Sequence, residues 1–164
     1  MSNIIQTTTE LAIHMASGYA KKGGVFADAT CGNGHDTLRL AKMGPSKLYA
    51  FDIQSDAIEN TRRLLISEGF GPQLKDGTIE LIRDSHENMR DHIGKSAHTA
   101  APVDVIIFNL GYLPGGDKHI TTGEISTRKA AEASLTLLAK DGLLCITMYS
   151  GHPEGQREKE ALLG

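Results

Sequence analysis

A glycine-rich stretch has the residue types to hold a ligand. It reads DATCGNGHDT over residues 28–37, after the apolar run 24–27 and before a helical pattern. Gly32 and Gly34 permit a sharp turn and let a ligand approach the backbone. Free amides at a helix start favour a carboxylate or phosphate, and Asp28 could accept hydrogen bonds from a polar or cationic group. An ordinary glycine-rich turn would use the same residues.

A second acidic residue follows these glycines at a sequence separation of about 20 residues. Asp52 ends the apolar run 48–51 and follows Gly34 by 18 residues and Gly32 by 20. An acid about 20 residues beyond a glycine turn commonly holds the hydroxyls of a ribose. Thr37 stands where a dinucleotide fingerprint needs its third glycine, and the frame instead resembles the first motif of class I S-adenosylmethionine-dependent methyltransferases. An exposed aspartate at a strand end is the plainer alternative.

Residues that could bind the nitrogen of a substrate follow the apolar run 103–108. The segment Asn109-Leu110-Gly111-Tyr112 resembles the Asn-Pro-Pro-Tyr motif of enzymes that methylate amino nitrogens. A side-chain oxygen and a main-chain carbonyl could accept the N–H groups of the target, and the aromatic ring could stack on a flat base. Alternatively, Asn109 caps the strand and Tyr112 packs against the fold.

The acceptor nitrogen must be neutral to attack a methyl group. An alkylamine is mostly protonated at neutral pH, so the site must lower its pKa by desolvation or supply a base. Asp117, His119 and His152 lie in two polar, glycine-containing loops and are equal candidates for that base. Lys118 could contact an RNA phosphate.

The elements that must position these residues alternate along the chain. Apolar runs typical of strands occupy 24–27, 48–51, 78–82, 103–108 and 143–148, and helical patterns occupy 4–20, 35–43, 56–67, 87–92, 126–138 and 156–163. The first helical pattern is expected to lie against the sheet, mostly through one face formed by Ile5, Leu11, Ala12, Met15 and Tyr19. The alternation predicts an α/β fold with a doubly wound, mainly parallel sheet. Its strands would bring their carboxyl ends to one edge.

The loop after the third strand would flank the adenine of a bound nucleoside. Asp84 or Ser85 could bond the adenine amino group there, or Asp84 could cap the short helix that follows.

Length and composition limit the function classes. The 164 residues suit a single domain over 1–164, and the net charge of −3 disfavours strong non-specific binding of nucleic acid. The two cysteines and seven scattered histidines form no metal-binding spacing, so no metal is expected. No apolar run suits a membrane span or a signal peptide, which makes the cytoplasm the expected location.

Together the motifs resemble one family. The segments 28–37, 51–54, 109–118 and 151–155 look like those of the MnmM (YtqB-like) family. The resemblance implies a Rossmann-like class I methyltransferase that uses S-adenosyl-L-methionine. It also implies tRNA, through its anticodon arm, as the partner. The expected reaction converts 5-aminomethyl-2-thiouridine at the wobble position to 5-methylaminomethyl-2-thiouridine.

The same resemblance assigns roles to residues. Asp52 would take the ribose hydroxyls with Gln54 beside it, and Ser85 and His86 would lie near adenine. The methionine end of the cofactor would be lined by Asp28, Gly32, Asn33, Gly34, His35, Asp36 and Thr37. The target base would be met by Asn109, Gly111 and Tyr112, with Asp117, Lys118 and His152 around it.

Proteins of this family normally continue with two further strands that form an antiparallel hairpin. This sequence ends at Gly164, so the hairpin is expected to be absent and the fifth strand to keep an exposed edge. Reduced stability, or a homodimer formed through that edge, would follow. Three alternative functions remain open at this point: an rRNA base methyltransferase, a nucleotide-dependent oxidoreductase and an inactive binding module.

Overall fold

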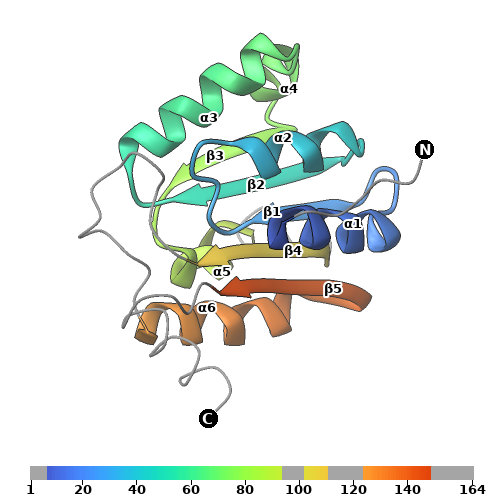
Figure 1. Ribbon diagram of the computed structural model, residues 1–164, viewed down its shortest axis with the longest axis vertical. Coiled ribbons are helices and arrows are strands. Elements are labelled where there is room, and N and C mark those ends of the chain that lie inside the picture. Colours follow the sequence, from blue (N-terminus) through green and yellow to red (C-terminus); the bar gives the residue numbers. More distant parts are fainter. Residues whose placement is uncertain (1–6, 94–101, 111–123, 149–164) are drawn as a thin grey trace.

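Five parallel strands form the sheet of this protein. The computed structural model describes residues 7–93, 102–110 and 124–148, and the strands lie in the order β3-β2-β1-β4-β5 (Figure 1). Their bounds are β1 (Val25–Asp28), β2 (Lys47–Asp52), β3 (Ile79–Arg83), β4 (Val103–Leu110) and β5 (Leu138–Met148). The reversal of strand order between β1 and β4 confirms the predicted doubly wound, parallel α/β fold.

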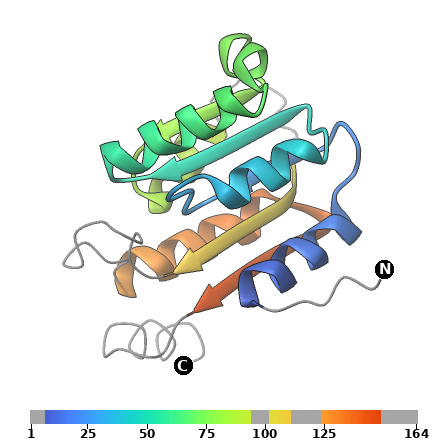
Figure 2. The same ribbon diagram turned by 45° about the horizontal axis from the view of Figure 1, so that its top comes forward.

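Helices cover both faces of the sheet. One face carries α1 (Thr8–Tyr19), α2 (His35–Lys42) and α3 (Ser55–Ser67), and the other carries α5 (Met89–Ile93) and α6 (Glu124–Leu137), as Figures 1 and 2 show. A short α4 (Gly71–Lys75) follows α3, and the 3-10 turn η1 (His86–Asn88) precedes α5. No helix within the described ranges is both long enough and apolar enough to cross a membrane.

Alternating side chains of the central strands fill two cores. Phe26 and Ile107 pack with residues of α1, α2 and α3, whereas Ala27, Ile106 and Phe108 pack with residues of α5 and α6. All five are essentially buried. Burial on both faces explains why the central strands read as continuous apolar runs rather than as alternating patterns.

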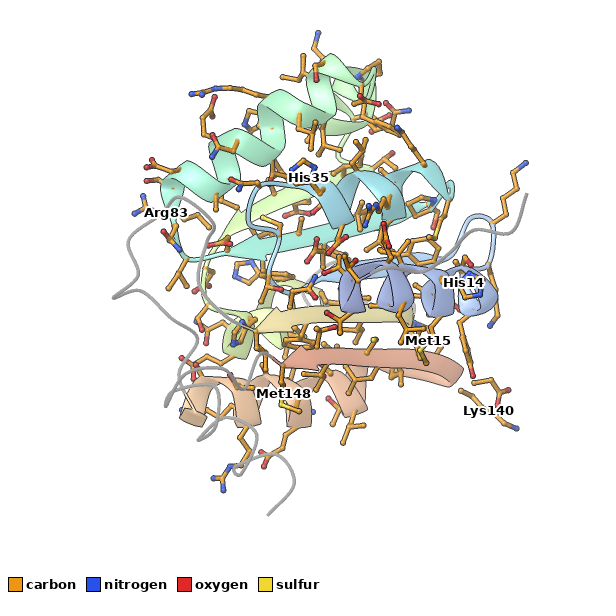
Figure 3. The ribbon with its side chains drawn as sticks, in the orientation of Figure 1. His14, Met15, His35, Arg83, Lys140 and Met148 are labelled. Carbon is orange, nitrogen blue, oxygen red and sulfur yellow. The ribbon has the colours of Figure 1, made fainter. Side chains whose placement is uncertain are left out.

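Helix α1 begins at a capping box but presents a face that differs from the predicted one. Thr7 Oγ1 accepts a hydrogen bond from the Glu10 amide at 3.1 Å, and the Glu10 carboxylate accepts one from the Thr7 amide. The helix packs on the sheet through buried Ala12 and Ala16. Of the residues predicted on the sheet-facing side, Ala12 is buried as expected, and Ile5 lies outside the described residues. The prediction is wrong for Leu11, Met15 and Tyr19, which are 43–47 % exposed; Met15 is labelled in Figure 3.

Strand β5 begins earlier than its apolar run predicts. Leu138 pairs with Val103 directly after α6, yet Leu143 pairs with Val105, so residues 139–142 form a bulge. Asp141 takes a left-handed conformation there, with φ 64°. The residues between the predicted helix 126–138 and the predicted strand 143–148 therefore form this bulge.

The carboxyl ends of the strands meet at one edge. Figure 3 labels Arg83 and Met148 at the ends of β3 and β5 on that side. Within the described residues β5 pairs with β4 alone. The predicted helix 156–163 lies outside the described residues. Homodimer formation through the outer edge of β5 stays a prediction.

Candidate active site

The glycine corner joins β1 to α2 and depends on two left-handed glycines. Gly32 has φ 52° and Gly34, the N-cap of α2, has φ 85°. A Cβ added to Gly34 would lie 2.8 Å from the Cα of Thr61 in α3. Gly34 is therefore required both by its backbone conformation and by the close approach of α3.

Asp28 lies buried beneath this corner. Its carboxylate accepts hydrogen bonds from the Thr30 amide at 3.1 Å and from the Thr37 hydroxyl at 2.6 Å. Burial raises the pKa of Asp28 to about 7, although the Thr37 hydroxyl opposes the rise. Because the side chain has no exposed surface, its observed contacts hold the corner together. Its expected contact with a cofactor stays a prediction.

Asp52 ties the end of β2 to the glycine corner. Its Oδ2 accepts the Gly32 amide at 3.0 Å and its Oδ1 accepts the Gln54 amide at 2.9 Å. The spacing of about 20 residues thus brings the acid to the glycines, as predicted. Each carboxylate oxygen retains a second lone pair, so Asp52 fits two neighbouring hydroxyl groups such as those of a ribose.

The remaining residues of the corner differ in accessibility. His35 begins α2 with an exposed side chain, labelled in Figure 3. Asn33 Oδ1 accepts a hydrogen bond from Asn60 at 3.1 Å. Cys31 is buried and accepts a weak hydrogen bond from Thr61, and burial raises the pKa of its thiol. A thiol held neutral in this way packs and does not act as a nucleophile.

Asp84 binds side chains of the helical segment that follows β3. Its carboxylate accepts hydrogen bonds from the Ser85 amide at 2.7 Å, from Asn88 Nδ2 at 2.9 Å and from the His92 ring at 2.8 Å. The hydrogen bond from His92, followed by that from Asn88, lowers the pKa of Asp84. Ser85 in turn caps the turn η1 by accepting the Glu87 amide at 3.4 Å. The cap that the sequence left open for Asp84 is therefore Ser85, and a contact of Asp84 with adenine stays a prediction.

His86 is the buried member of the segment after β3. The residue is 7 % exposed, its ring packs edge-on against Phe108 at 5.6 Å, and it bonds the backbone of Ala29. Burial lowers the pKa of His86, which favours the neutral ring. Its Nε2 is buried and has no hydrogen-bond partner in the described part of the chain. His86 Nε2 can therefore accept or donate one further hydrogen bond between the ends of β1 and β4.

Asn109, near the end of β4, faces the glycine corner. Its backbone amide donates to Thr30 Oγ1 at 2.7 Å, and its side-chain Nδ2 donates to Asp36 Oδ2 at 2.5 Å. Arg39 donates to the other Asp36 oxygen at 3.2 Å. Asn109 Oδ1 is buried and finds no partner among the residues that the structure describes. Sequence reasoning grouped Asp36 with the cofactor and missed this pair, whose members lie 73 positions apart.

Electrostatics of the corner are anionic. Burial raises the pKa of Asp36, and the nearby Arg39 guanidinium opposes that rise. Asp36 and Asp52 both act on the carboxyl of Asp28 by repulsion. Carboxyl groups gathered in this way suit a cationic group rather than a phosphate. No set of three metal-ligating side chains gathers in the described segments.

Several predicted site residues cannot be placed. Lying outside the described residues are Gly111, Tyr112, Asp117, Lys118, His119 and His152. Their assigned roles therefore stay predictions.

Comparison with known proteins places this fold and site in a family. The chain is 38 % identical over 161 residues to the "tRNA (mnm(5)s(2)U34)-methyltransferase, chloroplastic" of Arabidopsis thaliana, covering 94 % of this chain but 57 % of the plant protein. It therefore spans little more than half the length of that relative.

Solved structures agree. A putative rRNA-methylase from Clostridium thermocellum superimposes with a TM-score of 0.85 at 33 % identity, over 98 % of this chain and 82 % of its own. A putative methyltransferase from Streptococcus mutans, in complex with SAH, gives a TM-score of 0.78 at 34 % identity, over 98 % and 81 %. The fold is thus the Rossmann-like fold of class I methyltransferases, as predicted. Residues 48–164 match the model of the family described as "Putative rRNA methylase", and the chain belongs to that family.

Proposed function

We propose that this protein is an S-adenosylmethionine-dependent N-methyltransferase of tRNA. Its substrate would be the amine of 5-aminomethyl-2-thiouridine at the wobble position, and its product the 5-methylaminomethyl form. The name of the plant relative and the SAH complex of the Streptococcus mutans protein support the reaction and the cofactor. The observation that carries the proposal is the buried, unpartnered Oδ1 of Asn109, an acceptor that suits an amine N–H.

The glycine corner fits the cofactor. Asp52 keeps lone pairs for the two ribose hydroxyls while two backbone amides fix its orientation. The carboxyl group of the half-buried Asp52 could also complement the positive charge of a sulfonium or an ammonium group. When bound, S-adenosylmethionine supplies a methyl group on positively charged sulfur, and this group is transferred in line to the acceptor.

Asn109 would orient the acceptor amine. An N–H that bonds to Oδ1 leaves the nitrogen lone pair free to point toward the corner. Since the leaving group departs neutral, alignment provides most of the rate enhancement. One proton must still leave the nitrogen, and Asp117, His119 and His152 remain the proposed acceptors for it. Tyr112 would stack on the thiouracil ring.

An rRNA base is the second candidate substrate, because the family description names rRNA. The alternative of a nucleotide-dependent oxidoreductase loses its support with the family assignment. An inactive binding module would bind the cofactor without transferring its methyl group. A cytoplasmic location and contact with the anticodon arm belong to the proposal and have no separate support in the fold.

One experiment separates these functions. The protein is incubated with labelled S-adenosylmethionine and either tRNA from a strain lacking the last wobble methylation or rRNA from the same strain, and the nucleosides are analysed by mass. We expect label in 5-methylaminomethyl-2-thiouridine alone. Label in an rRNA nucleoside would establish an rRNA methyltransferase. Cofactor binding without transfer would establish an inactive binding module. Asn109→Ala should abolish most transfer, whereas the exposed Asp91→Asn serves as the matched control.

A further inference from the structure

The pair formed by Asp36 and Asn109 has a property that neither residue has alone. A side-chain amide carries an acceptor on one arm and a donor on the other, and rotation by half a turn exchanges them. An ionised carboxylate accepts hydrogen bonds but cannot donate them. Asp36 Oδ2 lies 2.5 Å from Asn109 Nδ2, so the amide must turn its NH₂ arm to Asp36 and its oxygen away.

The surroundings hold Asp36 in this role. Both of its oxygens are occupied by protein donors, Asn109 on Oδ2 and Arg39 on Oδ1. The residue is 8 % exposed and lies in the first turn of α2, where a negative charge is favoured by the helix. Little of its surface is left for a cofactor, in contrast to Asp52, whose carboxylate is only half-buried.

We propose that Asp36 is a positioning residue that fixes the amide orientation of Asn109, so that Oδ1 is presented to the N–H of the acceptor amine. Arg39 completes the arrangement by holding the second oxygen of Asp36. This inference rests on the proposed function, since it concerns how that reaction selects an amine. It replaces the expectation that Asp36 lines the methionine end of the cofactor.

The fixed orientation of the Asn109 amide makes it selective for an N–H donor. An amide free to rotate would present its NH₂ arm to the acceptor part of the time. That arm cannot accept an N–H, and it would instead bond the nitrogen lone pair that must attack. Fixing the orientation therefore removes a competing, unproductive pose, and the loss of Asp36 should lower kcat rather than weaken cofactor binding.

Three variants test this. Asp36→Asn removes the charge that fixes the orientation. Asn109→Asp sets two carboxylates against each other. The exchange Asp36→Asn with Asn109→Asp restores a donor–acceptor pair of reversed polarity, in which the amide donates from position 36 and a carboxylate oxygen stays free at position 109.

We expect kcat to fall roughly ten- to hundredfold in each single variant, with the dissociation constant of SAH changed by less than about threefold. The exchange variant should recover at least about tenfold of the lost kcat, a non-additive result typical of residues in contact. Asp91→Asn is the control. A large loss of SAH affinity in Asp36→Asn with kcat unchanged would make Asp36 a cofactor ligand and overturn the inference. Strictly additive losses would overturn it as well.

A readout that needs no activity separates this inference from the proposed function. The side-chain amide signal of Asn109 in ¹⁵N-labelled protein is identified by its loss in Asn109→Asp. It should shift in Asp36→Asn and stay in place in Asp91→Asn. An unshifted signal would refute the contact in solution. If the wild-type protein transferred no methyl group to any RNA, the proposed function would fail, and this signal alone would decide whether Asp36 orients Asn109.

Discussion

Replacement of Asp28 by asparagine should change how stability depends on pH. Asp28 is fully buried beneath the glycine corner, and burial raises its pKa to about 7. The side-chain amide that this substitution introduces has nearly the same shape as a carboxylic acid. Its oxygen can accept the Thr30 amide and its NH₂ can donate to the Thr37 hydroxyl, so Asp28→Asn keeps both observed contacts without the charge.

The magnitude follows from the shift. A rise from 3.8 to about 7 is roughly three pKa units, and each unit corresponds to about 1.4 kcal/mol. Between these two pH values the folded protein keeps a proton that the unfolded chain has lost. The free energy of unfolding must therefore fall as pH rises through this window, by about 1.4 kcal/mol per pH unit and on the order of 4 kcal/mol in all. Asp28→Asn has no titrating carboxyl at this position, so its free energy of unfolding should lack this part of the pH dependence.

Urea denaturation at intervals between about pH 4 and about pH 8 measures the effect. The wild-type curve should approach and cross the Asp28→Asn curve from above as pH rises, while Asp91→Asn should run parallel to the wild type. Parallel curves for wild type and Asp28→Asn across the whole window would contradict the prediction. Such a result would mean that Asp28 is as well solvated as an exposed aspartate.

Three further substitutions test the site and its support. Gly34→Ala should destabilise the fold by roughly 1–3 kcal/mol and weaken SAH binding by calorimetry, because its Cβ would meet Thr61; Gly77→Ala, at φ 82° with open space, should lose only the backbone preference of about 1 kcal/mol. Asp52→Asn should weaken SAH binding about tenfold, equivalent to about 1.4 kcal/mol. The thermal midpoint should also fall, because the new side chain can accept only one of the Gly32 and Gln54 amides. Asp104→Ala removes the buried carboxylate that accepts the Val25 amide of β1 at 3.0 Å. The free energy of unfolding, measured by urea denaturation, should fall by about 1–3 kcal/mol, and the affinity of the folded protein for SAH should not change.

Much of the site follows from sequence because parallel strands align their ends. Buried runs identify the strands, and a doubly wound order then brings the end of β2 beside the end of β1. The contact between Asp52 and the Gly32 amide was predictable for that reason. Family membership followed from the same motifs, since the glycine corner, Asp52 and Asn109 each carry part of it.

Other features depend on packing that sequence patterns do not encode. On α1 the apolar stripe Leu11, Met15 and Tyr19 lies beside the stripe Ala12 and Ala16, and periodicity alone does not decide which of the two faces the sheet. The sheet instead accepts the alanines, which let the helix approach closely. The partner of Asp36 was equally hidden, because a side-chain pair across 73 positions depends on rotamers as well as on topology.

The two halves of the site are joined through Thr30. Its amide donates to Asp28, and its hydroxyl accepts the amide of Asn109, so one residue links the buried acid of the corner to the acceptor side. Beside it, the Ala29 amide donates to the Ile107 carbonyl at 2.9 Å and fixes the corner to β4. Protonated Asp28 can still accept the Thr30 amide through its carbonyl oxygen and can donate its hydroxyl to Thr37, so its titration keeps this link in place. Any displacement of Thr30 would move Asn109, so the acceptor side depends on the buried contacts of the corner. Asp28→Asn, which keeps both contacts, should therefore retain methyl transfer while it loses its part of the stability slope.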